Sequence, residues 1–499
     1  MNWASSICIA LGFSETRELV ETACREAENG ETFLEFRLDH LRRPDEGPRA
    51  IRAFLKDHPE CTVLATCRRR QNHGKFIGSV EEQLRILEAA VKAGARAVDL
   101  EIESAESLAA PLSTLGAKAK LVISYHNFEG TPPLEPVLRR MLRLPADAHK
   151  LVATARKPSD IHRVLAAARA HPRNRMIAFS MGEIGFPSRV IAPAFGGLFT
   201  YAAPAAAAAG TAPGQVDARV LRRLYRLEKL TRSSKIYGII ADPVGHSISP
   251  AVHNRAFQSR RVDAVYLPFR VEPSQLKDFM QLAAKLPVAG FSVTIPHKRK
   301  ILRHLDSVDP LARRIGAVNT VTRDGERMVG ANTDWLGVVR ALERETVLAG
   351  RNAVVLGAGG AARAAVFGLL ERGARVQILN RSRERAERLA AELGASGSGG
   401  LDALAELPCD ILVNTTSVGL REDASLVAAE AIPKHAVVLD AVYDPPHTRL
   451  LRDAASRGAR SIEGKWWLVY QAAEQIRLWT GREAPIEVMG AAFDRAGEL

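Results

Sequence analysis

The sequence predicts an α/β protein: an N-terminal (β/α)8 barrel, followed by a second α/β domain and a Rossmann-type parallel sheet. Two observations carry this prediction. Eight short apolar, β-prone segments recur about every thirty residues over the first 225 or so residues, with helical patterns between them. In the second half, an apolar run stops at a glycine cluster and an alanine-rich helical pattern follows at once. That order is typical of a strand, a tight phosphate-binding turn and a helix.

Length and composition limit the class of protein. A chain of 499 residues is too long for one compact core, so we expect two or three domains. No apolar run approaches the ~20 residues of a membrane span, and the N-terminus lacks the basic start of a secretory signal. The five cysteines form neither a disulfide framework nor a zinc pattern, which predicts a reducing, cytoplasmic setting and no metal.

The net charge of +13 has two interpretations, a nucleic-acid surface or a protein that handles anionic small molecules. No block of like charge stands out and no aromatic residues alternate with the basic ones. We therefore expect small-molecule partners, with neither nucleic acid nor a membrane. The sequence leaves the oligomeric state open.

The predicted barrel strands follow one another regularly along the chain. They are Ile7–Leu11, Phe33–Arg37, Val63–Cys67, Ala97–Glu101, Leu121–Tyr125, Leu151–Ala155, Met176–Ser180 and Leu198–Tyr201. Helical patterns lie between them, such as Glu81–Ala93 and Ser159–Ala170. In a (β/α)8 barrel the active site lies at the carboxyl ends of the strands, so polar residues at those ends are candidate active-site residues.

Those ends are unusually charged. The second strand gives Glu35, Arg37 and Asp39, the third ends beside Arg68, the fifth ends at His126, and Lys150 opens the sixth. A lysine in an apolar barrel interior has its charged form disfavoured, so its free amine can attack a carbonyl carbon. A nearby histidine can move a proton, and arginines can hold a carboxylate. The pattern predicts a Schiff-base enzyme that acts on a keto acid.

These residues resemble type I 3-dehydroquinate dehydratase over about residues 5 to 228. The quoted segments are Glu35–Asp39, Ser124–Phe128, Lys150, Ser188–Arg189 and Thr211–Gln215. The resemblance implies that Lys150 forms an imine with the substrate ketone and that His126 removes the adjacent proton, so that loss of water gives 3-dehydroshikimate. It also implies a set of substrate-contacting residues: Glu35, Arg37, Arg68, Arg189, Thr211 and Gln215.

One position departs from that family. The family usually places a glutamate four residues after the arginine at Arg68, where it orients the histidine, and this chain has Asn72. An asparagine can still hydrogen-bond an imidazole but cannot stabilise an imidazolium as a carboxylate does. We expect this departure to affect the rate of the dehydratase half and not its identity.

A short polar linker between domains follows the barrel. Residues Gln215 to Leu230 have the apolar spacing of one last amphipathic helix, and Thr231–Ser234 breaks that pattern. We expect four segments: a barrel at 1–230, a substrate-binding domain at 235–338, a nucleotide-binding domain at 339–462, and C-terminal helices at 463–499 that pack on the substrate-binding domain.

Four polar turns precede the nucleotide-binding unit. They are Asp242–Pro250, Gly290–Lys298, Gly316–Thr320 and Gly330–Asp334. Each turn contains a hydroxyl, amide or charged side chain. In the first turn, Ser247 and Ser249 are two positions apart and present hydroxyls that suit the binding of a polyol acid. Together the turns predict a substrate pocket.

The nucleotide-binding unit starts with the apolar run Val354–Leu356. The turn and helix start that follow would hold the pyrophosphate through Gly357, Ala358, Gly359, Gly360 and Ala361. After the next predicted strand, Val376–Leu379, an NAD-binding enzyme would place an acidic residue. This chain instead has the basic run Asn380, Arg381, Ser382, Arg383 and then Arg385, which suits a 2′-phosphate and favours NADP(H) over NAD.

The second half closely resembles shikimate dehydrogenase over about residues 235 to 499. The resemblance implies that Ser247 and Ser249 contact the substrate carboxylate and that Lys298 and Asp334 are the catalytic pair. It also implies that Thr294, Asn319 and Gln471 hold the substrate hydroxyls and that Tyr443 lies near the substrate. Asn414 and Thr415, at a strand end, would flank the nicotinamide side of the cofactor.

Three further positions carry expectations. Ser292 stands where that family commonly has asparagine, and Trp467 stands where it commonly has methionine, so a bulky indole could reshape the nicotinamide site. The segment Ser396–Gly400 is predicted to be a flexible surface loop.

The sequence thus predicts a bifunctional enzyme. The barrel would dehydrate 3-dehydroquinate to 3-dehydroshikimate, and the C-terminal half would reduce 3-dehydroshikimate to shikimate with NADPH. Three alternatives stay open: a preference for quinate in the second half, a barrel made weak or inactive by Asn72, and a basic nucleic-acid binder.

Overall fold

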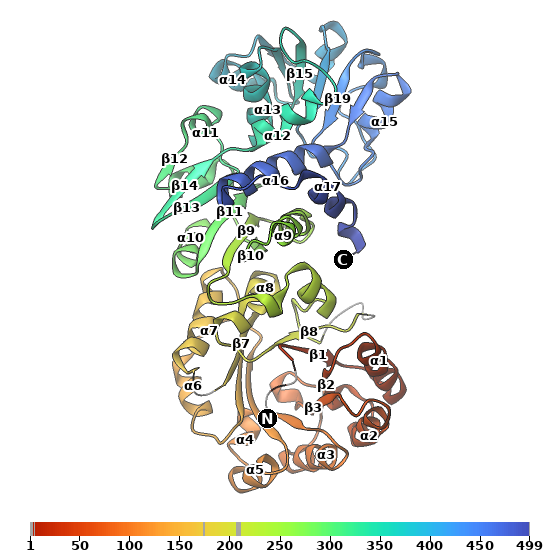
Figure 1. Cartoon of the computed structure of the whole chain (residues 1–499), viewed down its shortest axis with the longest axis vertical. Coiled ribbons are helices and arrows are strands. Elements are labelled where there is room, and N and C mark those ends of the chain that lie inside the picture. The colour runs from red at the N-terminus through yellow and green to blue at the C-terminus, as the bar shows by residue number, and fades with distance from the viewer. Residues whose placement is uncertain (1–2, 4, 173–174, 206–210, 499) are drawn as a thin grey trace. The chain divides into compact units, whose positions relative to one another are not determined.

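The computed structural model describes residue 3 and residues 5–172, 175–205 and 211–498 (Figure 1). The chain divides into two compact units. The first holds Met1–Ser234 together with Leu267–Leu286, and the second holds Lys235–Tyr266 together with Pro287–Leu499. None of the described helices is long and apolar enough to cross a membrane.

Eight strands form the sheet of the first unit. They are β1 (Ile7–Leu11), β2 (Phe33–Arg37), β3 (Thr62–Thr66), β4 (Ala97–Glu101), β5 (Lys120–Asn127), β6 (Ala148–Thr154), β7 (Met176–Met181) and β8 (Thr200–Ala202). The strand order is β7-β6-β5-β4-β3-β2-β1-β8, and β1 pairs in parallel with both β2 and β8. Just before β8, Leu198 N donates to Met176 O at 2.8 Å, which nearly closes the barrel. The predicted barrel is confirmed.

A helix follows each of the first seven strands, as Figure 1 shows for α1, α2, α3, α6 and α7. The helices are α1 (Thr16–Glu28), α2 (Gly47–Asp57), α3 (Val80–Lys92), α4 (Ile102–Ala105), α5 (Ala109–Gly116), α6 (Glu135–Met141), α7 (Ser159–Ala170) and α8 (Gly182–Ile191). The start of α3 illustrates how the sequence sets a helix end: Ser79 and Glu82 form a reciprocal capping box.

The single helix predicted over Gln215–Leu230 is wrong. A short π-helical turn, η6 (Val220–Leu224), is followed by a 3-10 turn, η7 (Leu227–Lys229). Arg226 between them has φ of 51°, in the left-handed region that a continuous right-handed helix does not allow. The apolar spacing is real, but the backbone changes direction within it.

Two further sheets follow Ser234 along the chain, and all their strands except the segment Leu267–Arg270 lie in the second unit. The first sheet has β9 (Lys235–Ala241), β10 (Ala264–Arg270), β11 (Val288–Val293), β12 (Ser307–Val308), β13 (Thr320–Asp324) and β14 (Arg327–Ala331), in the order β10-β9-β11-β13-β14-β12. Three helices lie between these strands in the chain, α9 (Ser249–Ser259), α10 (Leu276–Lys285) and α11 (Pro310–Ile315), and α10 belongs to the first unit. Residues of α16 (Gly464–Thr480) and α17 (Ile486–Asp494) complete its apolar core with Val252, Phe257 and Tyr266.

The other sheet is parallel throughout. It has β15 (Asn352–Leu356), β16 (Arg375–Leu379), β17 (Gly397–Gly399), β18 (Ile411–Asn414), β19 (Val437–Asp440) and β20 (Arg460–Ile462), in the order β17-β16-β15-β18-β19-β20. The strand order reverses between β15 and β18, and ligands of such sheets bind at the carboxyl ends of the strands there. The expectation of a loop over Ser396–Gly400 is wrong, because β17 pairs in parallel with β16.

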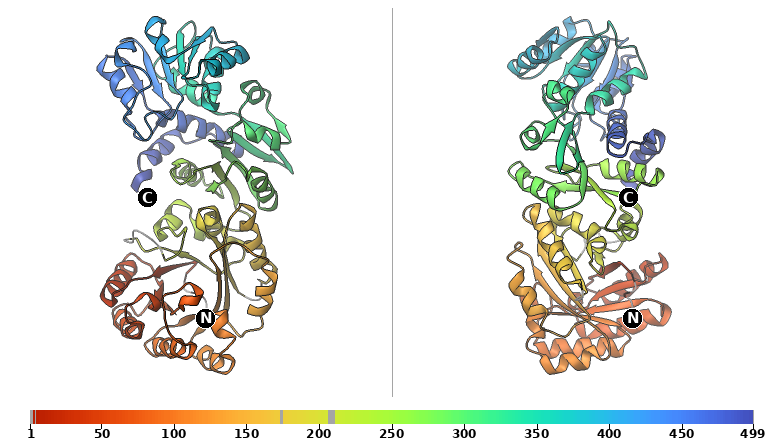
Figure 2. Two further views of the ribbon diagram at one scale, coloured as in Figure 1. Left: turned by 180° about the vertical axis from the view of Figure 1, so that it is seen from behind. Right: turned by 60° about the vertical axis from the view of Figure 1, so that its left-hand side comes forward.

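Helices cover both faces of this parallel sheet (Figure 2). On one face, α12 (Asp334–Glu343), α13 (Gly360–Glu371) and α14 (Arg383–Leu393) pack into a core that includes Trp467 of α16. On the other face, α15 (Arg449–Ser456) packs with Leu404 and Ile432. The Rossmann-type parallel sheet predicted from the glycine-rich turn is confirmed.

Candidate active sites

The lysine of the barrel lies among carboxylates. Lys150 is the third residue of β6, which begins at Ala148 and not at the lysine, and it is only 4% exposed. Its Nζ lies 3.1 Å from Asp99 Oδ2 and 3.8 Å from Glu35 Oε1, and it sits 3.9 Å from the centre of the Tyr201 ring. The predicted apolar surroundings are therefore wrong: two acidic side chains and an aromatic face enclose the amine.

Asp99 connects Lys150 to the rest of the site. Its Oδ1 accepts from Arg68 Nη2 at 2.8 Å and from Ser124 Oγ at 2.7 Å. Burial raises the pKa of Asp99, but Lys150 and Arg68 outweigh it and hold the pKa at about 2. Asp99 is thus a charged acceptor that fixes the positions of three side chains from neighbouring strands.

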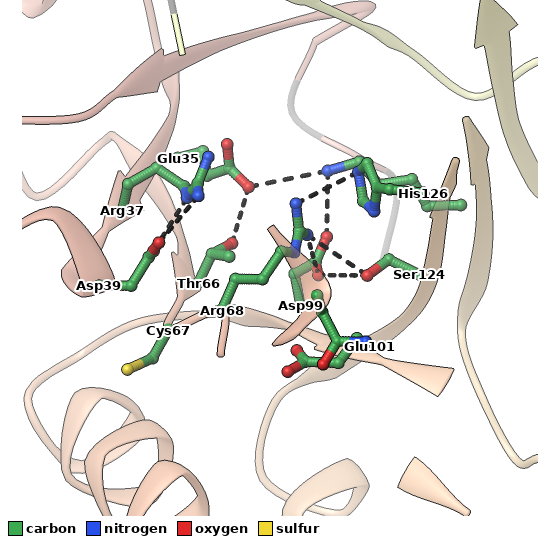
Figure 3. A network of polar contacts seen from close by, with 12 residues as sticks. Glu35, Arg37, Asp39, Thr66, Cys67, Arg68, Asp99, Glu101, Ser124 and His126 are labelled. Carbon is green, nitrogen blue, oxygen red and sulfur yellow. Dashed lines mark hydrogen bonds and ion pairs between the residues drawn. The ribbon is translucent and has the colours of Figure 1, made fainter. Parts of the chain in front are cut away.

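His126 is arranged as a neutral base. Its Nε2 lies 3.3 Å from Arg68 Nη1, and a guanidinium can only donate, so Nε2 carries the lone pair (Figure 3). Burial lowers the pKa of His126 well below its usual value, and the charges of Arg68, Lys150 and Arg37 lower it further. The imidazole is therefore unprotonated at neutral pH and able to take a proton.

Two predicted substrate contacts of the barrel are held by neighbours. Arg37 forms a bidentate pair with Asp39 at 2.9 Å for both bonds. Glu35 Oε1 accepts from Thr66 Oγ1 at 2.7 Å, which orients the carboxylate beside Lys150. Both side chains are buried, so their geometry is set before any ligand binds.

Arg189 is a buried cation without an acidic partner in the described part of the chain. It is 1% exposed, its Nη2 donates to Pro213 O at 2.9 Å, and its Nε and Nη1 have no partner. The guanidinium lies 4.6 Å from the centre of the Phe179 ring, and burial lowers the pKa of Arg189 to about 9. A buried guanidinium with two unused nitrogens suits an anionic ligand group.

The remaining predicted residues of the barrel site lie in one loop after β8. Thr211 Oγ1 donates to Gln215 Oε1 at 3.2 Å, and the loop reaches Arg189 through the Pro213 carbonyl. Hydrogen bonds and ion pairs join Lys150, Glu35, Arg68 and His126 into one network. Among the described residues, Arg37, Arg189, Thr211 and Gln215 share no such bond with Lys150 or His126.

Asn72 does not contact the histidine within the described chain. Its Nδ2 donates to Glu103 Oε2 at 2.9 Å, and its Oδ1 has no partner. Asn72 therefore does not hydrogen-bond the imidazole, although an asparagine is able to, and Arg68 contacts His126.

The sequence prediction missed Asp99 and Ser124, which lie at the centre of this network. A signal for Asp99 existed: it is a carboxylate in the middle of the apolar strand Ala97–Glu101, where a charge is costly unless it is paired. No comparable signal marks Ser124, since a serine on a strand is common.

The second site is centred on a lysine–aspartate pair. Lys298 Nζ donates to Asp334 Oδ2 at 2.5 Å, and Asp334 is the first residue of α12. Asn319 Nδ2 donates to Asp334 Oδ1 at 2.9 Å and lies 3.2 Å from Gln471 Oε1. Four predicted residues from separate segments therefore meet in one cluster.

The two serines lie at the start of α9. Ser249 N donates to Ser247 Oγ at 3.3 Å, and Ile248 between them packs against the same apolar core as Tyr443. Thr294 follows β11, and its N–H donates to Ile240 O on β9 at 3.2 Å. Tyr443 and the loop that carries the two serines therefore border one core.

Two residues noted as departures have defined places. The Trp467 indole is 5% exposed and donates to the backbone oxygen of Asp334 at 3.0 Å, so it supports the start of α12 from within the core. Ser292 Oγ accepts from Tyr266 Oη at 2.7 Å and donates to Gln475 Oε1 at 2.9 Å. Both side chains are thereby fixed within the protein.

A nucleotide-binding turn joins β15 to α13. Gly357 has φ of 113°, and a Cβ there would lie 2.6 Å from Thr415 Oγ1, so only glycine fits. No side chain caps the first turn of α13 at Gly359, which leaves N–H groups for an anion. Ala358 and Ala361 flank the turn and are partly exposed.

The side chains that follow β16 and β18 have different surroundings. Asn380 Nδ2 donates to Ser382 O at 2.9 Å, while Arg381 and Arg385 are exposed and pair with no acidic side chain among the described residues. Asn414 Nδ2 donates to Asp440 Oδ1 at 2.8 Å and Thr415 Oγ1 donates to Leu356 O at 2.7 Å, which ties the ends of the central strands together.

The fold and the sites define a class of protein: a barrel lyase with a buried lysine at its centre, joined to a Rossmann oxidoreductase. The profile of type I 3-dehydroquinase matches residues 7–232. Profiles of the shikimate dehydrogenase substrate-binding domain, of shikimate/quinate 5-dehydrogenase and of the shikimate 5′-dehydrogenase C-terminal domain match residues 239–321, 340–418 and 468–492. The chain belongs to the family of bifunctional 3-dehydroquinate dehydratase/shikimate dehydrogenases, as its similarity to individual relatives shows.

The chloroplastic bifunctional 3-dehydroquinate dehydratase/shikimate dehydrogenase of Arabidopsis thaliana is 35% identical over 97% of this chain and 83% of its own length. The NADP(+) shikimate dehydrogenase of Haloarcula marismortui is 46% identical over 51% of this chain and 96% of its own length.

Solved structures agree for the second half. A shikimate dehydrogenase in complex with NADP+ superposes with a TM-score of 0.51 at 39% identity, covering 53% of this chain and 96% of that one. The Thermus thermophilus enzyme in complex with NADP(H) and shikimate gives a TM-score of 0.50 at 38% identity, covering 52% of this chain and 99% of that one.

Proposed function

We propose that the first unit dehydrates 3-dehydroquinate to 3-dehydroshikimate through an imine on Lys150. The second unit then reduces 3-dehydroshikimate to shikimate with NADPH. The observation that carries the proposal is the cluster of a buried lysine, a charged aspartate and a neutral histidine in the barrel. Relatives named for both activities, one of which is similar over nearly the whole chain, support it.

In the dehydratase site, the amine of Lys150, in its unprotonated form, attacks the ketone carbon, and water leaves as the imine forms. His126 takes the proton from the carbon next to the imine, and the electron pair moves into the imine. The neighbouring hydroxyl leaves with the proton that His126 returns, as water. Hydrolysis of the imine releases 3-dehydroshikimate and restores Lys150.

Arg189 is the residue best suited to hold the substrate carboxylate in the barrel. Two of its nitrogens have no protein partner and lie in a buried environment, where a charge-assisted hydrogen bond is strong. Thr211 and Gln215 lie in the loop that Arg189 contacts. We assign them, with Glu35, Arg37 and Arg68, to contacts with the substrate.

In the reductase site, Lys298 and Asp334 handle the proton. NADPH supplies a hydride when it is bound. As the ketone becomes an alkoxide, Lys298 donates a proton to the oxygen, and Asp334 holds the ammonium in place through its short contact. Ser247 and Ser249 hold the carboxylate, and Thr294, Asn319 and Gln471 hold the hydroxyls.

The residues present fit NADP(H). The turn at Gly357 has no room for a Cβ, and the first N–H groups of α13 are uncapped, as a pyrophosphate site requires. Arg381 and Arg385 are exposed cations without acidic partners in the described chain, as a 2′-phosphate site requires. We assign Asn380 and Ser382 to the same site, and Asn414 and Thr415 to the nicotinamide side.

We further propose the four-segment division at 1–230, 235–338, 339–462 and 463–499 as the functional domains. All five cysteines are free thiols, which supports a reducing compartment, and we infer a cytoplasmic enzyme whose partners are its small-molecule substrates. An inactive barrel is not favoured, because its lysine, histidine and arginines are retained and joined in one network.

The test is to mix the purified protein with 3-dehydroquinate and NADPH and to follow the absorbance of NADPH. We expect NADPH to be consumed and shikimate to form. Lys150→Ala should abolish consumption from 3-dehydroquinate but not from 3-dehydroshikimate, and Lys298→Ala should abolish both. Consumption by Lys150→Ala at the wild-type rate from 3-dehydroquinate would reject the assignment of the barrel. Oxidation of quinate faster than of shikimate would assign the second unit to quinate.

A further inference from the structure

A buried glutamine on α16 organises the polar groups behind the reductase site. Gln475 is 0% exposed and lies outside the set of residues expected to touch substrate or cofactor. Its Nε2 donates to Thr320 Oγ1 at 3.0 Å and to Asn319 O at 3.3 Å. Its Oε1 lies 2.9 Å from both Ser292 Oγ and His253 Nε2. One side chain therefore joins four segments that are distant in sequence.

The direction of these hydrogen bonds is determined. The backbone oxygen of Asn319 can only accept, so the NH2 end of Gln475 faces Asn319 and Thr320. Thr320 Oγ1, having accepted from Gln475, donates to Asn319 Oδ1 at 2.8 Å. The backbone N–H of Thr333 also donates to that oxygen, at 2.7 Å. With Oδ1 occupied in this way, the Nδ2 of Asn319 points to Asp334 Oδ1, 2.9 Å away.

The other end of the glutamine is equally constrained. Because Oε1 can only accept, Ser292 donates to it, and Ser292 in turn accepts from Tyr266 Oη at 2.7 Å. The His253 ring stacks on Tyr266 with centroids 4.1 Å apart and planes 9° apart, which limits movement of the histidine next to Gln475. The amide of Gln475 is thus held at both ends and cannot turn over without breaking several bonds.

We propose that Gln475 is a positioning residue of the reductase: it sets the polarity of the chain Gln475–Thr320–Asn319, so that Asn319 presents N–H donors beside the Lys298–Asp334 pair. The substrate hydroxyl at Asn319 then has to act as an acceptor there. Without Gln475, the Thr320 hydroxyl can turn away, and the Asn319 amide then loses one of the donors that hold its Oδ1. The inference rests on the proposed reductase activity. Gln475 would be needed for that activity although it does not touch the substrate.

The test uses two isosteric variants, Gln475→Met and Thr320→Val, assayed with 3-dehydroshikimate and NADPH. Each should raise the KM for 3-dehydroshikimate about tenfold, the effect of one lost orienting hydrogen bond, and leave the KM for NADPH unchanged. The double variant should be no worse than either single variant, because both break the same chain. Thr320→Ser, which keeps the hydroxyl, should retain the wild-type KM.

Gln83→Met is the matched control, since Gln83 is also a 0% exposed glutamine and lies in the first unit. It should leave both reductase KM values unchanged. A wild-type protein that does not reduce 3-dehydroshikimate would reject the reductase itself. An active wild type with an unchanged KM in Thr320→Val, or with additive losses in the double variant, would overturn the positioning role. If Gln475→Met does not fold, Thr320→Val and Thr320→Ser decide the question.

Discussion

Lys150 Nζ lies 3.1 Å from Asp99 Oδ2, inside a barrel in which neither side chain is more than 5% exposed. The two residues are on β6 and β4, with β5 between them. Asp99 uses its other oxygen to bind Arg68 and Ser124, so one carboxylate fixes the position of the amine and of the arginine that contacts His126. The distance between the nucleophile and the base thus depends on Asp99.

Replacing Asp99 with asparagine should therefore impair imine formation. The Asp99→Asn side chain keeps the size but loses the charge, and a hydrogen bond to a charged partner contributes about 1.5 to 3 kcal/mol. We expect the dehydratase rate to fall by about ten- to a hundredfold. The measurement is the turnover of 3-dehydroquinate, together with the mass of the adduct trapped on Lys150 by borohydride.

Asp147→Asn is the control for this variant. Asp147 accepts from Leu121 N at 2.8 Å at the amino ends of β5 and β6, away from the carboxyl ends that hold the site. It should keep the wild-type dehydratase rate. Reductase turnover should be unchanged in both variants, and a wild-type dehydratase rate in Asp99→Asn would contradict the positioning role of the carboxylate.

The arginines after β16 should determine the choice of cofactor. Arg381→Ala and Arg385→Ala should each raise the KM for NADPH about tenfold and leave the KM for NADH unchanged, because only NADPH has the 2′-phosphate. Arg383 pairs with Asp402 at 2.9 Å, so Arg383→Ala is the matched control and should change neither value. Equal losses with both cofactors would show that the arginines act on the fold instead.

Gly357→Ala tests the pyrophosphate turn. The residue has φ of 113°, and an added Cβ would lie 2.6 Å from Thr415 Oγ1, so both backbone strain and a clash are expected. Gly350 has φ of 75° and open space around its Cβ position, so Gly350→Ala measures the backbone strain alone, about 1 to 2 kcal/mol. Gly357→Ala should lower the free energy of unfolding by more than Gly350→Ala does, and it should also raise the KM for NADPH. Equal stabilities and an unchanged KM would contradict the role of this glycine.

Much of the fold could be predicted because the local patterns were strong. Each barrel strand is a short apolar run between helical patterns, and β15 is an apolar run that ends at Gly357. The helix predicted over Gln215–Leu230 failed because apolar spacing does not show that Arg226 takes a left-handed conformation. Only the surrounding structure can impose that conformation on a non-glycine residue.

The sites were predictable residue by residue but not as networks. Lys150 and His126 could be named from their strand ends, yet the partner of Lys150 depends on the register that brings Asp99, fifty-one positions away, next to it. The Gln475–Ser292 bond spans 183 positions. No local pattern encodes such contacts, because they exist only after the sheets and helices have assembled.

His253 makes the stability of the second unit sensitive to acid. Burial lowers the pKa of His253 to about 4, although the two acceptors beside its ring nitrogens, Ser249 O and Gln475 Oε1, favour the protonated ring. In the neutral ring only one of these two contacts is a hydrogen bond, because the ring then carries a single N–H. In the unfolded chain the pKa is about 6.5, so the unfolded state binds more protons between pH 6.5 and 4. Stability from the neutral ring is fully present above pH 6.5 and is lost as the pH falls toward 4, by on the order of 3 kcal/mol in all.

The measurement is the melting temperature at pH values from about 7 to about 5 for the wild type and for His253→Asn. The variant is expected to be less stable at pH 7, because it loses the stack on Tyr266, but its melting temperature should fall less on acidification. Other titrating groups contribute equally to both proteins, so the difference in slope reports His253 alone. Parallel slopes would show that the buried ring does not stay neutral down to about pH 5, as its lowered pKa requires.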